Sequence, residues 1–351
     1  MTFLLLSLAL LQAASPASDP FDVEFSEVAP GVVVAQRPDP LRDPVVGNVT
    51  ILINDRDVVL VDAGASPRTA HQILEEVRRR TDLPISTPML THGHEDHVLG
   101  TEVFRAAYPG LRVVTRRGTR DYLAPDGPVA RRLQTVAERI EGMRAAGLGE
   151  LEALRREGAA PELLRYLERR WGPDLEAAAR EKSRVRLVEP DEVFEGVFEI
   201  FRGKRTIRLL DLGPGKSGSA TVVHLPEERI VMAGDVVVAP VPYGFARDPA
   251  GWIATLKAVE RLGPRTIIPG HGPPLSGSEY LDRVIALAEF VRQGVEEGLA
   301  RGLDGEAVSH SLDFMPWVRE FAGTDPIREH LFHEWFIEPA VARAISAAGG
   351  S

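Results

Sequence analysis

The segment from Thr91 to Gly100 constrains this chain more than any other, because it places three histidines and an aspartate within six positions. These residues are His92, His94, Asp96 and His97. Imidazole nitrogens and carboxylate oxygens are good ligands for divalent cations such as Zn²⁺, and a turn at the end of a strand can aim several of them into one cavity. The segment therefore predicts a metal site, and it favours hydrolysis at a metal as the function.

The spacing of these residues divides them between two neighbouring positions. His92 and His94 are two residues apart, so their side chains point the same way from an extended backbone. Asp96 and His97 lie around the following bend and can serve a second metal. Gly93 is expected to let the backbone pass close to the ions and to take φ angles that a residue with a Cβ resists. One turn can thus supply two metals.

Further along the chain, other apolar runs end in residues of ligand type. Asp235 follows the run 230–234, and His271 follows the run 266–270. Asp62 ends a third run, and a glycine-rich loop occupies residues 213–218. These motifs, in this order, resemble those of the metallo-β-lactamase superfamily, and the match spans roughly Asn48 to Pro274.

The resemblance implies both a fold and a set of ligands. The fold is of the α/β class, an αββα sandwich of two sheets between two helical layers. One zinc is implied at His92 and His94, and the other at Asp96, His97 and His271. Asp235 is implied to bridge the two metals, and Asp62 to support the ligands from behind.

One position departs from the pattern of the family. The glycine-rich loop usually reads Gly-Pro-Gly-His, but here the histidine position is Lys216. A lysine amine binds zinc only when neutral, which is unfavourable for a group with an ordinary pKa of about 10.4. Four interpretations stay open: a single zinc at Asp96, His97 and His271, two zincs with the first under-coordinated, a Lys216 ammonium that replaces the first cation, or a degenerate, inactive site.

The remaining pattern predicts one sheet domain with two helical additions. Short β-rich runs at 32–35, 48–53 and 57–61 are joined by turns, and a helix is expected from Pro67 with Ser66 as its cap. Alternating strands and helices then indicate a layered α/β domain over residues 21–274. Sheet patterning, interrupted at 128, resumes at Val185.

Two helical segments are expected beside this sheet domain. Between residues 128 and 182, apolar residues recur at helical spacing in Arg- and Glu-rich sequence, which predicts two or three inserted amphipathic helices. The insert is either a lid over the site or a peripheral hairpin. Residues 275–351 form a predicted helical extension, in which Phe332, Trp335, Phe336 and Ile337 are expected to dock the tail on the core or on another subunit.

Composition limits where the protein acts and on what. Residues 1–18 are apolar and then small, as in a cleaved signal peptide, so the expected location is periplasmic or secreted, with no integral membrane anchor after cleavage. The chain has no cysteine, which excludes disulfides and a lipid-modified cysteine. A net charge of -10 disfavours nucleic acid as a partner. The expected partner is a small-molecule substrate, and the oligomeric state is left open.

The function predicted from these features is zinc-dependent hydrolysis by a metal-bound hydroxide. The resemblance implies an activated carbonyl as target, in an ester, lactone, thioester or β-lactam. Asp96 orients the water or binds the metal, and the metal or Lys216 stabilises the oxyanion. Two alternatives remain: a metal-binding protein with a degenerate first site and little catalysis, and an iron-dependent oxidoreductase on the same fold. The histidine-rich ligand set favours zinc over iron.

Overall fold

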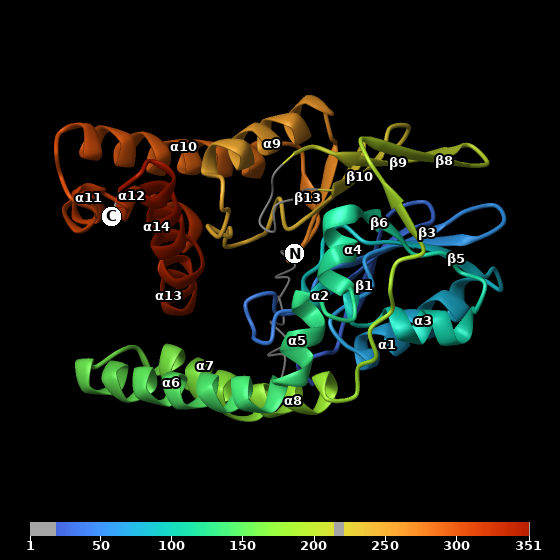
Figure 1. The fold of residues 1–351 in the computed structure, drawn as a ribbon, viewed down its shortest axis with the longest axis horizontal. Coiled ribbons are helices and arrows are strands. Elements are labelled where there is room, and N and C mark those ends of the chain that lie inside the picture. Colours follow the sequence, from blue (N-terminus) through green and yellow to red (C-terminus); the bar gives the residue numbers. More distant parts are fainter. Residues whose placement is uncertain (1–18, 214–220, 351) are drawn as a thin grey trace, which may run out of the picture.

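The computed structural model describes residues 19–213 and 221–350. The expected signal peptide and Lys216 lie outside these ranges, so both stay predictions from sequence. Two β-sheets face each other in the structure, and helices cover both outer faces, as the ribbon shows (Figure 1). The predicted αββα sandwich is confirmed. Within the described ranges, no helix has the length and apolar character needed to cross a membrane.

The first sheet contains seven strands in chain order, from β1 to β7. β1 to β4 are antiparallel neighbours, whereas β4 to β7 run parallel. One of the predicted turns joins β3 to β4 in a hairpin, and the Asn54 N–H donates to the carbonyl of Asp57 across it at 2.9 Å. The strands are β1 (Glu24–Ala29), β2 (Val32–Gln36), β3 (Val49–Ile53), β4 (Val58–Val61), β5 (Ile85–Met89), β6 (Val114–Arg116) and β7 (Glu192–Phe194).

The second sheet contains six strands in the spatial order β13-β12-β11-β10-β9-β8. β11 and β12 are parallel, and the other neighbours are antiparallel. The strands are β8 (Val197–Arg202), β9 (Arg205–Asp211), β10 (Thr221–Leu225), β11 (Ile230–Gly234), β12 (Thr266–Pro269) and β13 (Leu275–Ser276). Each sheet therefore holds parallel strands whose carboxyl ends can meet at one edge of the sandwich.

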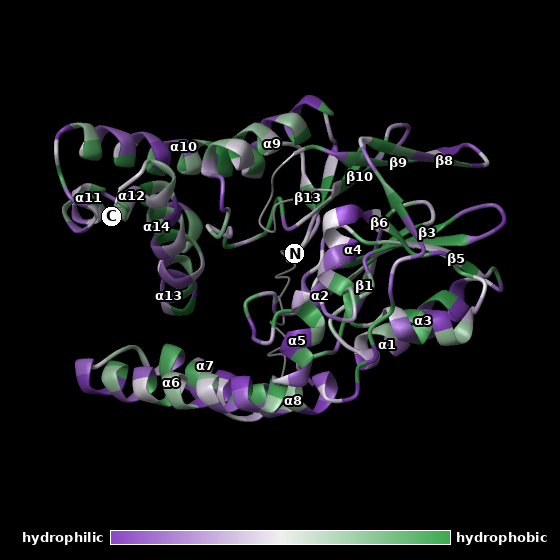
Figure 2. Cartoon of the chain, in the orientation of Figure 1, coloured by the Kyte–Doolittle hydropathy of each residue, from purple (hydrophilic) through white to green (hydrophobic). Residues whose placement is uncertain are grey.

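Alternation along the strands fills the layers of the sandwich. Successive side chains of a strand point to opposite faces, so Val32 and Val34 of β2 enter the core between the sheets, while Val33 faces the helices. Val223 and Val222 of β10 divide in the same way between the inner core and the opposite helical layer. Figure 2 shows these strands as predominantly hydrophobic and many of the loops that join them as hydrophilic.

Helices before residue 128 and after 248 form the outer layers. Ser66 caps the first helix as predicted, because its side chain accepts a hydrogen bond from the Thr69 N–H. α10 lies beside α9 over the second sheet, and both contribute to the same buried core. These helices are α1 (Pro67–Arg80), α2 (Glu95–Val98), α3 (Thr101–Ala107), α4 (Arg117–Leu123), α9 (Pro249–Arg261) and α10 (Glu279–Ala300).

The helical insert leaves the first sheet after α4 and returns to it at β7. It forms the lower arm in Figure 1. Leu163 and Leu167 of α7 are buried in the core that also holds α9 and α10. The helices of the insert are α5 (Pro128–Gln134), α6 (Val136–Glu157), α7 (Pro161–Arg169), the π-helix η1 (Arg170–Asp174) and α8 (Leu175–Lys182).

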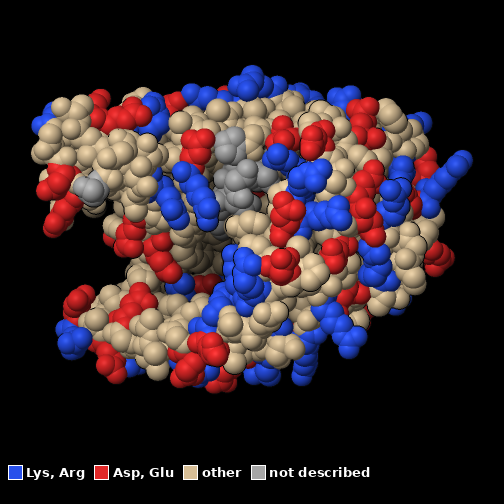
Figure 3. All heavy atoms as spheres, in the orientation of Figure 1, with Lys and Arg blue, Asp and Glu red and all other residues tan. Residues whose placement is uncertain are grey.

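The C-terminal extension completes the outer helical layer and forms the upper arm. Phe332, Trp335, Phe336 and Ile337 are buried in the core, which confirms the predicted docking of the tail. Figure 3 shows a hollow between the two arms, which meet where Arg170 pairs with Glu334 at 2.7 Å. Beyond α10, the extension has α11 (Gly305–Ser311), α12 (Met315–Phe321), α13 (Pro326–Phe332), the π-helix η2 (His333–Ile337) and α14 (Glu338–Ala347).

The structure differs from the sequence prediction in three respects. Sheet structure resumes at Glu192 rather than at Val185, because residues 185–191 form no strand. The insert contains four α-helices and a π-helix rather than two or three helices, because Gly158 ends α6 with a positive φ and Pro173 interrupts the helix before α8. α4 was not predicted, since it is only seven residues long and too short for a clear helical period. The limits of 21–274 and 275–351 as separate folding units stay a prediction.

Candidate metal centre

The predicted ligands meet because parallel strands end at the same edge of each sheet. Asp62 follows β4, and the segment from His92 to His97 follows the neighbouring strand β5. Asp235 follows β11, and His271 follows β12, which is parallel to it. The two facing sheets thus bring residues separated by almost 180 positions to one point between their ends.

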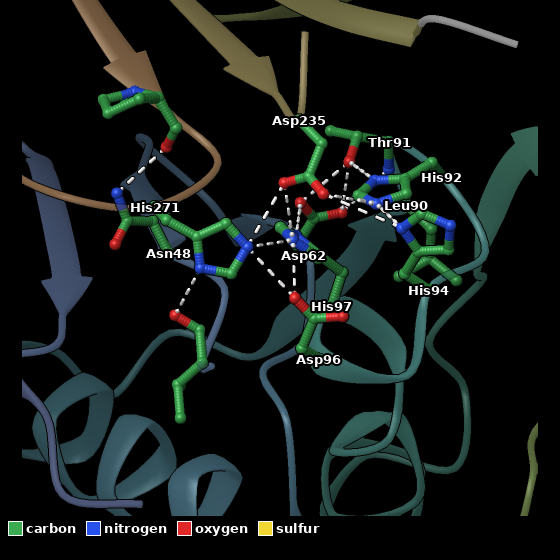
Figure 4. Close-up of polar contacts among 12 residues, drawn as sticks. Asn48, Asp62, Leu90, Thr91, His92, His94, Asp96, His97, Asp235 and His271 are labelled. Atoms are coloured by element: carbon green, nitrogen blue, oxygen red, sulfur yellow. Dashed lines mark hydrogen bonds and ion pairs between the residues drawn. The ribbon is translucent and has the colours of Figure 1, made fainter. Parts of the chain in front are cut away.

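Six predicted ligands form two groups that share Asp235 (Figure 4). Within each group, the donor atoms all lie within 4.8 Å of one another. Asp235 directs Oδ1 to the first group, 3.1 Å from His97 Nε2, and Oδ2 to the second, 3.4 Å from His92 Nε2. The groups are Asp96, His97, Asp235 and His271, and His92, His94 and Asp235. This division matches the one that the resemblance implied.

The chemistry of the first group fits a divalent cation. His271 Nδ1 lies 3.1 Å from the carbonyl oxygen of Val46, which can only accept a hydrogen bond, so the proton of a neutral His271 is on Nδ1. His97 Nδ1 likewise faces the carboxylate of Asp62 at 2.8 Å. In the neutral rings both Nε2 atoms therefore carry lone pairs, and they lie 3.3 Å apart. Two lone pairs facing each other beside two carboxylates favour a shared cation between them.

Asp62 also orients the second group, through Thr91. The Thr91 hydroxyl donates to Asp62 at 2.9–3.0 Å and has no second proton, so it accepts from His92 Nδ1 at 3.0 Å. His92 Nε2 is thereby left with its lone pair, 3.0 Å from His94 Nδ1. One buried carboxylate thus fixes the tautomers of a histidine in each group.

Burial and neighbouring charges shift the pKa values within the centre. Burial opposes the charged form of His97, but the carboxylates of Asp235, Asp96 and Asp62 outweigh it and hold the pKa of His97 well above its ordinary value. Burial, together with the neighbouring His97, lowers the pKa of His92 to about 4. The carboxylate-rich first group is therefore the stronger site for a positive charge.

Two glycines allow the backbone to approach the centre closely. A Cβ on Gly47 would lie 2.5 Å from the ring of His97, and one on Gly270 would lie 2.4 Å from Asp235 Oδ1. The expected φ of Gly93 was wrong, because this glycine does not have a positive φ. A Cβ on Gly93 would lie 2.6 Å from the Cβ of Tyr122, so the glycine makes room for α4.

A cavity of about 300 Å³ lies beside the centre. His94 and Asp96 line it, and these two ligands keep 19% and 18% of their side chains exposed, whereas the other four are at most 5% exposed. The insert supplies most of the apolar wall, with Val136, Ile140, Met143, Trp171, Leu175 and Ala178. The insert is thus a wall of the cavity next to the predicted metal site rather than a peripheral hairpin.

Several residues that shape the site were not found from the sequence. Asn48 holds the loop of His271, because its side chain donates to the carbonyls of Pro269 and Gly272 at 2.9 and 2.7 Å. Its partners lie more than 220 positions away, so no local pattern marks it. Thr91 was visible only as a neighbour of His92. The predicted catalytic role of Lys216 lies outside the described residues.

The chain is similar to known hydrolases. It is 22% identical over 299 residues to a linear primary-alkylsulfatase of a Pseudomonas species, which covers 76% of this chain and 51% of the relative. It is 33% identical over 103 residues to a hydroxyacylglutathione hydrolase of Stenotrophomonas maltophilia, which covers 29% of this chain and 33% of the relative. This chain therefore spans about half, or less, of the length of these curated relatives.

The fold likeness extends over the helical additions as well. The structure of a double mutant of the sec-alkyl sulfatase PisA1 matches 93% of this chain and 50% of its own, with a TM-score of 0.63 at 16% identity. The family model of the metallo-beta-lactamase superfamily matches residues 42–139 and 148–271, which is more than half of the chain. With its two facing sheets and its paired donor groups, this chain belongs to the metallo-beta-lactamase superfamily.

Proposed function

We propose that this protein is a zinc-dependent hydrolase that cleaves sulfate esters of alkyl chains to an alcohol and hydrogensulfate. The observation that carries this proposal is the cavity beside His94 and Asp96, whose apolar wall fits a hydrocarbon chain and whose basic residues fit an anion. The likeness to a linear primary-alkylsulfatase over 76% of the chain supports the same substrate class.

Zinc is proposed as the metal because of the donor set. Four imidazoles and two carboxylates, with no sulfur ligand, are typical of zinc hydrolases with an open coordination position. Zinc at these residues would supply a Lewis acid, which lowers the pKa of a coordinated water towards neutrality. Iron chemistry on the same fold is the alternative, and elemental analysis of the purified protein distinguishes the two metals.

The residues of this chain would position the reactants. His94 and Asp96 are the exposed members of the two groups, so the scissile ester approaches the centre on their side. Asp96 Oδ2 lies 3.0 Å from His271 Nε2, and its carboxylate can bind the metal or orient the attacking water. The buried histidines hold the metal, and the apolar wall excludes water from the chain of the substrate.

An activated carbonyl is the second candidate target. The likeness to a hydroxyacylglutathione hydrolase favours it, but that likeness covers only 29% of the chain. A substrate panel separates the candidates: octyl sulfate against 4-nitrophenyl octanoate, a thioester and a chromogenic β-lactam, each assayed with zinc-loaded protein. We expect octyl sulfate to give the highest kcat/KM. Turnover of the carbonyl substrates alone would contradict the sulfate proposal.

Replacing Lys216 with histidine is expected to raise the zinc content towards two equivalents. The substitution restores the residue that the family usually has in the glycine-rich loop, and a neutral imidazole binds zinc where an ammonium does not. Elemental analysis after dialysis against a fixed free zinc concentration measures the effect, with Lys204→His as a control on the hairpin between β8 and β9. An unchanged zinc content in Lys216→His would show that Lys216 does not weaken the metal site.

A further inference from the structure

Three cations of the helical insert converge on one carboxylate in the metal turn. Glu95 lies between His94 and Asp96, and its side chain is 8% exposed. Lys182 Nζ lies 2.6 Å from Glu95 Oε2, while Arg139 and Arg132 lie 3.4 and 3.6 Å from Oε1. A single carboxylate can balance the charge of only one of these three cations.

The remaining positive charge belongs to the two arginines and faces the cavity. Lys182 makes the short contact with Glu95, whereas Arg132 and Arg139 share the other oxygen at longer range. Both arginine side chains keep more than a third of their surface exposed, and both line the cavity. A guanidinium offers several N–H donors in one plane, which suits the oxygens of a sulfate or another oxyanion. The cavity thus has an anion-binding end beside the metal turn.

The order of residues along α5 and α6 gives the cavity a direction. Arg132, Val136, Arg139, Ile140 and Met143 recur at helical spacing and all line the cavity. The arginines stand beside the metal turn through Glu95, and Ile140 and Met143 continue the wall of the cavity beyond Arg139 with apolar side chains, of which Met143 is 45% exposed.

We propose that Arg132 and Arg139 bind the anionic group of the substrate and make the enzyme specific for alkyl chains that carry a negative charge at the reacting end. This inference rests on the proposed function and assigns its specificity to two residues of the insert. A neutral ester of the same chain length lacks the partner for the arginines and leaves their charge uncompensated beside Glu95.

Binding of alkanesulfonates, which resemble the substrate but lack the ester oxygen that is cleaved, tests the proposal on the zinc-loaded full chain. Calorimetry is expected to show octane-1-sulfonate binding about tenfold more tightly than hexane-1-sulfonate, because two more methylenes are buried. In R132Q/R139Q, both affinities should fall by about tenfold or more, with their ratio kept. R132K/R139K should bind within a few-fold of the wild type, and R131Q, on the exposed side of α5, should bind like the wild type.

The outcomes separate this inference from the proposed function. Unchanged sulfonate binding in R132Q/R139Q would overturn the inference. So would a change in the ratio of the octane-1-sulfonate and hexane-1-sulfonate affinities, because it would show that the arginines shape the apolar wall. Sulfonate binding as expected without turnover of octyl sulfate would keep the anion site and refute the hydrolase proposal. Turnover of octyl sulfate with an unchanged KM in R132Q/R139Q would support the hydrolase proposal and refute the anion site.

Discussion

Replacing Asp235 with alanine is expected to remove metal from both groups and to lower kcat/KM by about 10³-fold or more. Asp235 directs one carboxylate oxygen to each group, so its loss takes a ligand from both at once. A catalytic metal contributes several kcal/mol of transition-state stabilisation, and each 1.4 kcal/mol is about tenfold in rate. Elemental analysis and initial rates on the best substrate of the panel measure the two effects.

The control for this variant is Asp282→Ala, which removes an exposed carboxylate in the first turn of α10 that belongs to neither donor group. It should keep the metal content and the rate of the wild type. A D235A protein that retains both metals and full activity would show that Asp235 does not join the two groups.

Replacing Asp62 with alanine is expected to weaken metal binding about 10- to 100-fold at both groups, although Asp62 need not touch a metal. Its carboxylate fixes His97 directly and His92 through the Thr91 hydroxyl. Without this carboxylate, the rings of His92 and His97 can take the tautomer that carries the proton on Nε2, the nitrogen that would bind the metal. Competition with a chelating dye measures the zinc affinity of each of the two groups.

Thr91→Val provides the matched comparison, because it removes only the branch to His92 and leaves the contact between Asp62 and His97 in place. The second group should lose affinity, and the first should keep it. Equal losses at both groups in Thr91→Val, or unchanged affinity in Asp62→Ala, would contradict this account of how the ligands are oriented.

The sequence predicted which side chains the structure brings together, because the signals for them are local. His92, His94, Asp96 and His97 stand in one turn, and Asp235 and His271 each end an apolar run that reads as a strand. The resemblance to a known family supplied what the pattern alone did not, namely that these segments meet. The strand pairs β4–β5 and β11–β12 are each parallel, so the ligands that follow these strands lie at the same edge of each sheet.

The cavity was not predictable in the same way. Arg132 and Arg139 read as the polar face of an amphipathic helix, which is the ordinary reason for arginine at such positions. The position of these arginines depends on how the insert packs against the metal turn. There the Lys182 ammonium donates to the carboxylate of Glu95, which is 87 positions away in the sequence. Trp171 packs against the buried core and also lines the cavity. Helical periodicity predicts that a segment is helical but not which neighbour its polar face meets.

The central claim is that Asp96, His97, Asp235 and His271 hold a zinc ion, with a weaker second position at His92, His94 and Asp235. Anomalous diffraction from crystals of the zinc-loaded protein, recorded on both sides of the zinc absorption edge, tests it most directly. We expect a strong peak within bonding distance of His97 Nε2 and His271 Nε2, and an equal or weaker peak beside His92 Nε2. Zinc peaks found only elsewhere on the protein, or none at all, would contradict the claim.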